Sequence, residues 1–265
     1  QDLSWETTFN FTTTKNEVTD IGGLGEISTG NIEAIGTTGV IKPGWSLNEY
    51  YGYEMNGLLQ NAGEVAASAT PNSKPGAPKW IDHSPDGTIN AADRVSLGSQ
   101  FPDYTYGLNN VVRYKDWTLN VFIYGQEGKY LLNVNALESL YPLNYRRNLF
   151  KLHGLNRWTP TNTDTKWPSG VLTSSYGGGK VNNLSVEDAS FMRLKTVSVS
   201  YNVPVDNINF LKSLQLGLIG DNLLTVTDYT GWDPESNRLS SGNFSADISS
   251  YPTARSIILS LTASF

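Results

Sequence analysis

The sequence predicts an all-β fold of antiparallel strands joined by tight turns and long loops. The clearest sign lies in residues 254–265, where Ile257, Leu259, Leu261 and Ala263 share one face at the period of two that a strand requires. A second sign is the aromatic content of 7 Trp, 14 Tyr and 9 Phe, because Tyr and Trp suit surfaces that are apolar at one end and wet at the other. The third is that long and short connections follow one another along the chain.

Composition excludes several classes of protein. The formal net charge of −6 and the absence of a basic cluster interleaved with aromatics argue against a nucleic-acid partner. The absence of Cys excludes a disulfide scaffold and thiolate chemistry, and 2 His exclude an all-histidine metal site. No apolar run approaches the length of a spanning helix, but the mean hydropathy of −0.32 also suits barrel strands, in which only alternate residues are apolar.

No catalytic constellation emerges. Glu187 and Asp188 precede a predicted strand, and Asp233 and Glu235 flank Pro234 in a loop. Carboxylates so close in a loop are usually solvated turn residues, whereas a glycosidase needs two opposed carboxyl groups. We expect no enzymatic activity.

The chain order of the strands follows from these alternations. Lys115 and Asp116 form a tight turn between two strands whose apolar positions continue on the same side. In the strand after residue 190, Phe191, Val197 and Tyr201 are expected on one face. The predicted strands are residues 3–14, 45–59, 104–114, 117–123, 190–203, 214–226 and 254–265.

The connections between these strands differ in length. Residues 60–100, 126–187 and 228–251 are long loops, with a short helix expected within 130–141. Short turns on one side of the membrane and long loops on the other are typical of outer-membrane barrels. The segment 15–44, with a short strand expected near residues 32–35, is the exception, being long where a short turn is expected.

One loop has the spacing of a calcium site. Residues 82–93 follow the calcium loop of the EF-hand, with the required glycine, Gly87, at the sixth position. Ser84 and Asp93 replace stronger ligands, and an Asx-turn loop that folds without an ion is the alternative. The expected ligands of a structural Ca²⁺ are Asp82, Ser84, Asp86, the carbonyl of Thr88, Asn90 and Asp93.

A series of motifs runs along nearly the whole chain in one order. They are residues 45–57 (WSLNEYYGYEMNG), 93–98 (DRVSLG), 101–108 (FPDYTYGL), 157–160 (RWTP), 189–195 (ASFMRLK), 221–225 (DNLLT), 231–235 (GWDPE), 251–252 (YP) and the terminal Phe265. Together they resemble the SusC-like (RagA-like) TonB-dependent transporters of the bacterial outer membrane.

The resemblance implies that residues 1–265 are the C-terminal part of a transmembrane β-barrel of about 22 strands, of which about seven lie here. The plug domain and the N-terminal strands would lie outside this chain. The implied function is TonB-dependent import of a bulky nutrient, an oligosaccharide or a peptide. The implied partners are the rest of the barrel and plug, a SusD-like surface lipoprotein, TonB through the N-terminal region, and outer-membrane lipid.

The resemblance also orients the chain, with loops extracellular and the C-terminus periplasmic. Residues 254–265 would be the closing strand, whose free edge needs another strand because lipid does not tolerate open edges. Bands of outward-facing aromatics are expected at both edges of an apolar belt. Their members are Tyr104, Tyr114, Trp117, Tyr201 and Phe265.

A soluble carbohydrate-binding module with a structural calcium is the alternative function, with the alternating faces packed as a sandwich. For such a module, and equally for a glycan importer, tryptophans in the loops are candidates for stacking on sugars. Packing of long loops onto one another is the more ordinary role of each. These tryptophans are Trp80, Trp158, Trp167 and Trp232.

Overall fold

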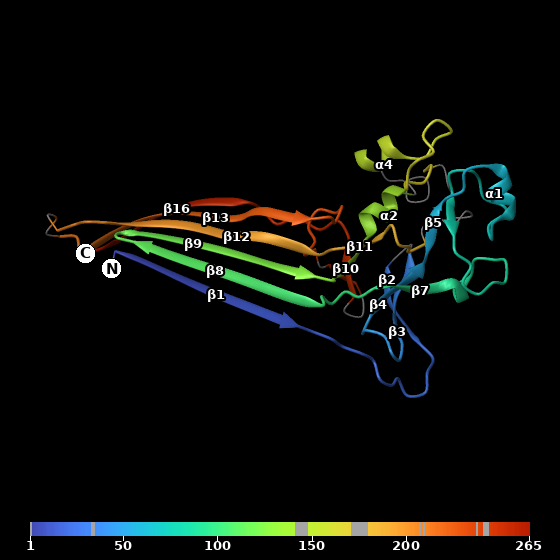
Figure 1. Cartoon of the computed structure of the whole chain (residues 1–265), viewed down its shortest axis with the longest axis horizontal. Helices are drawn as coiled ribbons and strands as arrows, with labels where there is room; N and C mark the ends of the chain where they lie inside the picture. The colour runs from blue at the N-terminus through green and yellow to red at the C-terminus, as the bar shows by residue number, and fades with distance from the viewer. Residues whose placement is uncertain are drawn as a thin grey trace.

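The computed structural model describes residues 2–32, 35–140, 148–170, 180–206, 208, 210–236, 238–240 and 244–265. The molecule is elongated, with a sheet of long strands at one end and a cluster of folded loops at the other (Figure 1). No helix in the described part of the chain is long and apolar enough to cross a membrane.

The long strands form one six-stranded antiparallel sheet in which spatial order follows chain order. In the described part of the chain, the first and last of them each have one partner strand, so both outer edges of the sheet are unpaired there. The six are β1 (Leu3–Thr13), β8 (Tyr104–Tyr114), β9 (Trp117–Glu127), β12 (Phe191–Val203), β13 (Ser213–Thr227) and β16 (Ser256–Ser264).

The two faces of this sheet differ in chemistry, as the alternation predicts. On the apolar face, Val199, Leu218 and Leu259 occupy one cross-strand row. Leu259 is 83% exposed, and no other described element covers this face. On the polar face, Asn120, Ser198 and Arg113 stand at positions that alternate with the apolar ones. A sheet with one uncovered apolar face and one polar face is typical of a barrel wall, which separates lipid from a water-filled interior. The six-stranded sheet is called the wall below.

Aromatic side chains gather at both ends of the apolar face. The rings of Trp117 and Tyr201 lie 4.6 Å apart beside Tyr114 at the tight-turn end, and those of Phe11 and Tyr104 lie 5.4 Å apart at the loop end. An 11-residue strand such as β8 is roughly 34 Å long, and a tilt of about 40° reduces its height to about 26 Å. This height matches an outer-membrane apolar band of about 25 Å.

An irregularity in β12 changes one predicted face. The register of β12 shifts between Leu194 and Thr196 against both neighbouring strands. Leu194 and Val197 therefore share the apolar face, while Phe191 turns to the polar face and packs edge-on against Tyr124 at 5.5 Å. The prediction that Phe191 shares a face with Val197 is wrong, because an extra residue reverses the alternation.

The long connections all lie at one end of the sheet, and the short ones at the other (Figure 1). Residues 14–103, 128–190 and 228–255 are long, whereas residues 115–116 and 204–212 are short. The segment 15–44 is therefore no exception to the alternation of long and short connections, because residues 45–59 do not form a strand of the six-stranded sheet. They form β4 (Glu49–Tyr53) and β5 (Met55–Leu58) inside the loop cluster, where consecutive tyrosines of β4 are buried on both faces.

The loop cluster has its own hydrophobic core, which the sequence did not predict. All three long connections contribute, with Tyr50, Leu59, Leu132, Trp167 and Ala246 among the buried residues. Its elements besides β4 and β5 are β2 (Ile27–Ile32), β3 (Gly36–Ile41), α1 (Ala62–Ala67), β6 (Pro78–Trp80), η1 (Ala91–Asp93), β7 (Arg94–Gly98), β10 (Tyr130–Asn133), α2 (Val134–Leu140), α4 (Lys151–Asn156), β11 (Val186–Asp188), β14 (Arg238–Ser240) and β15 (Phe244–Asp247).

Pairing between short strands joins the long connections to one another. β10 pairs with β11 and, in parallel, with β15, so residues 128–190 and 228–255 share one sheet. The helix expected within 130–141 is confirmed as α2, although the strand β10 precedes it. The strand expected near residues 32–35 ends at Ile32, and residues 33–34 lie outside the described part.

His153 makes the loop cluster sensitive to acid. It is 2% exposed, its Nδ1 lies 2.9 Å from Ser139 Oγ, and burial lowers its pKa to about 4. The unfolded chain takes up this proton near pH 6.5 while the folded cluster does not, so stability falls as the pH drops from about 6.5 to about 4, by up to about 3 kcal/mol. Fluorescence of Trp167, whose ring lies 4.4 Å from that of His153, should follow this transition.

The two histidines of the chain give a matched comparison for that acid transition. His153→Gln should flatten the pH dependence of cluster stability between pH 6.5 and 4. His83→Gln should leave it unchanged, because the side chain of His83 is 34% exposed at the surface. An unchanged transition in His153→Gln would contradict the assignment.

Candidate functional site

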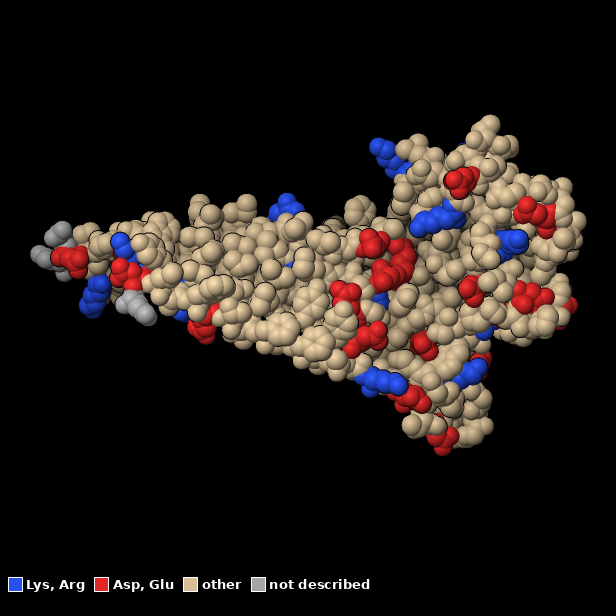
Figure 2. Space-filling view, viewed as in Figure 1, with Lys and Arg blue, Asp and Glu red and all other residues tan. Residues whose placement is uncertain are grey.

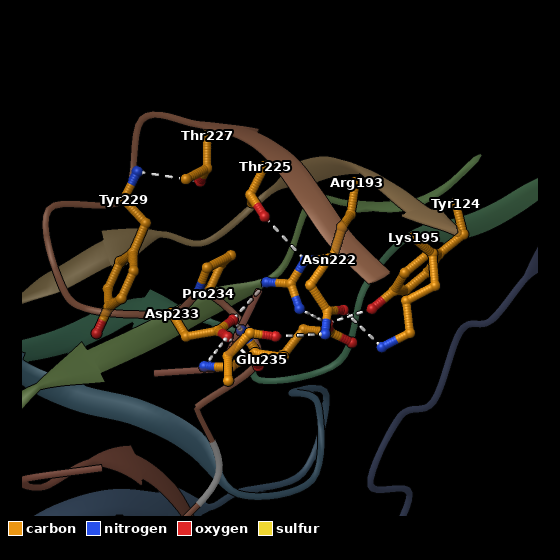
Figure 3. A network of polar contacts seen from close by, with 12 residues as sticks. Tyr124, Arg193, Lys195, Asn222, Thr225, Thr227, Tyr229, Asp233, Pro234 and Glu235 are labelled. Atoms are coloured by element: carbon orange, nitrogen blue, oxygen red, sulfur yellow. Dashed lines mark hydrogen bonds and ion pairs between the residues drawn. The ribbon is translucent and has the colours of Figure 1, made fainter. Parts of the chain in front are cut away.

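A buried ionic network lies on the polar face, where the sheet meets the loop cluster (Figure 3). Arg193 on β12 donates from one terminal nitrogen to Asp233 Oδ1 at 2.6 Å and from the other to Glu235 Oε2 at 2.7 Å. Its Nε donates to Thr225 Oγ1 on β13 at 2.9 Å, and Tyr124 on β9 donates its hydroxyl to Glu235. Three wall strands thus hold the loop that carries the two carboxylates.

The charges of this network are paired and largely shielded from water. The side chains of Arg193 and Asp233 are 3% and 6% exposed, and that of Glu235 is 30% exposed. Burial alone would raise the pKa of Asp233, but hydrogen bonds from Thr253 and from the Glu235 amide, together with Arg193, lower it. The lowered pKa favours the ionised carboxylate, and the planar guanidinium of Arg193 binds it with fixed geometry.

Further bonds fix both ends of the same loop. Lys129 donates to the carbonyl of Pro234 at 3.2 Å, and burial lowers its pKa. Lys195 donates to Asn222 Oδ1 at 2.8 Å, and Asn222 donates from Nδ2 to the carbonyl of Ala254 at 2.9 Å. Acidic side chains gather at this junction, while charges are sparse along the strands in the view of Figure 2. The arrangement positions a loop and offers no nucleophile or metal ligand set.

Sequence reasoning missed this network because it treated Asp233 and Glu235 as solvated turn residues. Glu187 was misread in the same way, since it is half-buried and accepts from the backbone amide and hydroxyl of Thr230, both at 2.9 Å. One signal for this network was available in the sequence. Arg193 lies on a predicted strand, and an arginine whose side chain faces the interior requires a buried counter-charge.

The candidate calcium residues do lie together in one loop, but they bond to one another. Buried Asp93 accepts from the amide and hydroxyl of Ser84 at 3.0 and 2.8 Å and from the Asn90 amide at 2.7 Å. These hydrogen bonds outweigh burial and lower its pKa to about 2. Asp82 accepts from the Gly87 amide at 2.8 Å, and Asp86 from the amide and hydroxyl of Thr88.

The donor set of this loop fits a cation poorly as it is folded. Asn90 Oδ1 caps Ala92, so that its amide nitrogen is the group that faces Asp86. Within the described residues there is no cluster of three or more acidic or histidine side chains placed to hold a metal. A hard cation needs six or more oxygens converging on one point. The calcium assignment stays a prediction.

Three of the four loop tryptophans pack loops together, which is the ordinary role. Trp80, Trp158 and Trp167 are buried, at 7%, 9% and 7% exposure, in two of the hydrophobic clusters of the loops. Trp232 is different, since 65% of it is exposed directly beside the ionic network. Trp232 alone among the four is therefore available to a ligand.

An open wall of antiparallel strands, apolar on one side and polar on the other, with its long connections gathered at one end, defines a piece of an outer-membrane type β-barrel. No family model matches the chain. TonB-dependent receptor P3 of Formosa agariphila is 32% identical over 278 residues, which cover 100% of this chain and 27% of that receptor.

TonB-dependent receptor SusC of Bacteroides thetaiotaomicron is 22% identical, with 100% of this chain and 25% of that protein covered. The structure of the RagAB peptide transporter matches with a TM-score of 0.74 at 23% identity and covers 100% of this chain and 28% of that one, a likeness that shows the fold. The chain is thus identified as a portion of a SusC-like TonB-dependent receptor, spanning about a quarter of the length of the curated relatives it matches.

Proposed function

We propose that the protein takes part in TonB-dependent import of a bulky nutrient, an oligosaccharide or a peptide, across the bacterial outer membrane. In this proposal the chain is the C-terminal part of the barrel, and the plug and the remaining strands come from the rest of the polypeptide. A SusD-like surface lipoprotein covers the mouth, and TonB supplies energy through the N-terminal region. We assign the protein no enzymatic role, because the curated relatives are TonB-dependent receptors.

One observation supports this proposal best, namely the uncovered apolar face with aromatic bands at both ends. Further strands of the same barrel would pair with the outer edges of β1 and β16. The soluble-module alternative needs a second sheet over the apolar face, and the described residues supply none.

Fractionation of cells that express the full-length transporter tests the membrane assignment. We expect it in the outer membrane, extractable only with detergent, with uptake of a labelled oligosaccharide or peptide that stops when TonB is removed. A full-length protein that is monodisperse in plain buffer would contradict the proposal. Uptake that continues without TonB would contradict the energy coupling.

Orientation is a separate proposal, with the loop cluster outside and the two short turns in the periplasm. An epitope tag inserted after Asp164, in an exposed stretch of the loop cluster, should be labelled by antibody on intact cells. A tag inserted at the turn of Lys115 and Asp116 should be labelled only after the outer membrane is permeabilised. The reverse pattern would overturn the orientation.

The calcium proposal has its own test. If residues 82–93 bind Ca²⁺, titration calorimetry of the purified transporter should show a site with a dissociation constant of about 0.1–1 mM, as in extracellular modules. Asp86→Asn should weaken it, because Asp86 is exposed and its carboxylate would be a direct ligand. The control Asp164→Asn changes another exposed acid in a different loop. Absence of binding at several millimolar would leave the Asx-turn interpretation.

A further inference from the structure

We propose that Trp232 and the hollow beside it form a subsite that binds a bulky apolar side chain of a peptide. The inference rests on the proposed import function and adds a place and a chemical class to it. It begins from the exposed indole, since the other loop tryptophans are needed for packing and this one is not.

The backbone that presents the indole is held on both sides. Before it, Tyr229 is buried and donates its hydroxyl to Asp247 Oδ2 at 2.9 Å. After it, Asp233 is held by Arg193. A Cβ atom at Gly231 would stand 2.3 Å from the Tyr229 ring, so only glycine allows this approach. The exposure of Trp232 therefore belongs to an ordered loop, and the side chain is preorganised for contact.

Two hollows share Gly231 and Trp232 as walls. The larger, of about 290 Å³, is otherwise lined by Phe150, Leu152, Lys151, Asn135 and Thr230. The smaller, of about 220 Å³, opens onto the polar face at Arg193 and Thr225. The indole thus stands between an apolar hollow in the loop cluster and the inner side of the wall, where a ligand entering the barrel would pass.

Two of the polar side chains that line the larger hollow, those of Asn135 and Thr230, already have hydrogen-bond partners within the protein. Asn135 donates from Nδ2 to the carbonyl of Asp247 at 3.2 Å and accepts from the Ser249 amide at 3.0 Å. Thr230 donates its hydroxyl and amide to Glu187. A sugar ring in this hollow would lose water from several hydroxyls, and Asn135 and Thr230 would offer them few new partners, which is costly. An apolar side chain has no hydrogen bonds to water to lose, and its binding removes the exposed indole and Leu152 from water.

The rim adds a positive charge that suits a peptide. Lys151 is exposed at the start of α4, and none of the ion pairs among the described residues involves it. Its ammonium would meet a carboxylate of the peptide, either an acidic side chain or the C-terminus, beside the apolar contact. We therefore assign a peptide, rather than an oligosaccharide, as the ligand of this subsite.

The test uses the full-length transporter with its lipoprotein, purified in detergent and exposed to a tryptic digest of casein. Retained peptides, identified by mass spectrometry, should be enriched in Leu, Ile and Phe. Trp232→Ala and Leu152→Ser should each reduce this enrichment at least fivefold, and Trp232→Phe should preserve most of it. Tyr251→Ala is the control, because Tyr251 is a 98% exposed aromatic that lines neither hollow.

Each of the other outcomes contradicts one stated part of the proposal. Unchanged enrichment in Trp232→Ala, with a melting temperature equal to that of the wild type, overturns the subsite. A wild-type transporter that retains no casein peptide but binds a mixture of starch and laminarin oligosaccharides overturns the ligand class. Uptake is measured in parallel in cells. Wild-type cells that import neither probe refute the import function itself, whereas equal import by wild type and Trp232→Ala refutes the subsite alone.

Discussion

Arg193→Ala is expected to release residues 228–255 from the wall. Removing the guanidinium leaves Asp233 and Glu235 as neighbouring carboxylates, one of them buried, without a counter-charge. Breaking one side of a buried ion pair costs about 3–5 kcal/mol. We expect a clear fall in the melting temperature of the purified transporter and rapid proteolysis within residues 228–255.

Two variants show whether this effect comes from the network. Arg193→Lys keeps the charge but cannot bond both carboxylates and Thr225 at once, so its loss should be intermediate. Arg113→Ala removes an arginine on the same face whose pair with Glu6, at 3.7 Å, is exposed, and should cost about 0–1 kcal/mol. If Arg193→Ala behaves like Arg113→Ala, the network does not anchor the loop.

Leu218→Lys is expected to impair assembly of the barrel in the outer membrane. Leu218 stands on the apolar face, in register with Val199 and Leu259, one cross-strand row inside the aromatic pair of Trp117 and Tyr201. A lysine on the lipid face costs about 2–4 kcal/mol at the bilayer midplane and about 0–1 kcal/mol near an interface, so the cost at Leu218 should fall between these limits. The measurement is the amount of heat-modifiable, folded transporter in outer-membrane fractions.

Ser198→Lys is the matched control for Leu218→Lys. Ser198 lies one residue from Val199 along β12 but on the polar face, opposite Asn120 and Ile219. The new ammonium would face the wet interior, so assembly should be close to that of the wild type. Equal defects in the two variants would show that the apolar face does not contact lipid.

The six-stranded sheet could be predicted from the sequence because the alternation within each long strand shows which of its residues share a face. In residues 214–220 and 257–263 the period of two is unbroken, and Leu214, Leu216 and Leu218 pair with Ala263, Leu261 and Leu259 on one face. The prediction failed at Phe191, where a one-residue irregularity at Lys195 reverses the alternation without a local signal in composition.

The candidate site was harder to predict because its parts meet only through the fold. Arg193 and Asp233 are 40 residues apart, and neither is unusual in its own stretch. Likewise, β4 resembles a wall strand in composition, but its buried Tyr50 and Tyr53 belong to different core clusters. Alternation shows which face a residue takes in a known sheet, whereas it carries no information about which sheet a short strand joins.

The shared core of the loop cluster has a consequence for how such proteins diversify. Tyr50, Leu132 and Ala246 come from three different connections and pack into one cluster. Transplanting one connection from a relative would therefore leave two others with surfaces shaped for the original. The unit that can be exchanged between relatives is therefore the whole loop cluster. New specificity should arise either by single substitutions at exposed positions such as Trp232 or by replacement of all three connections together.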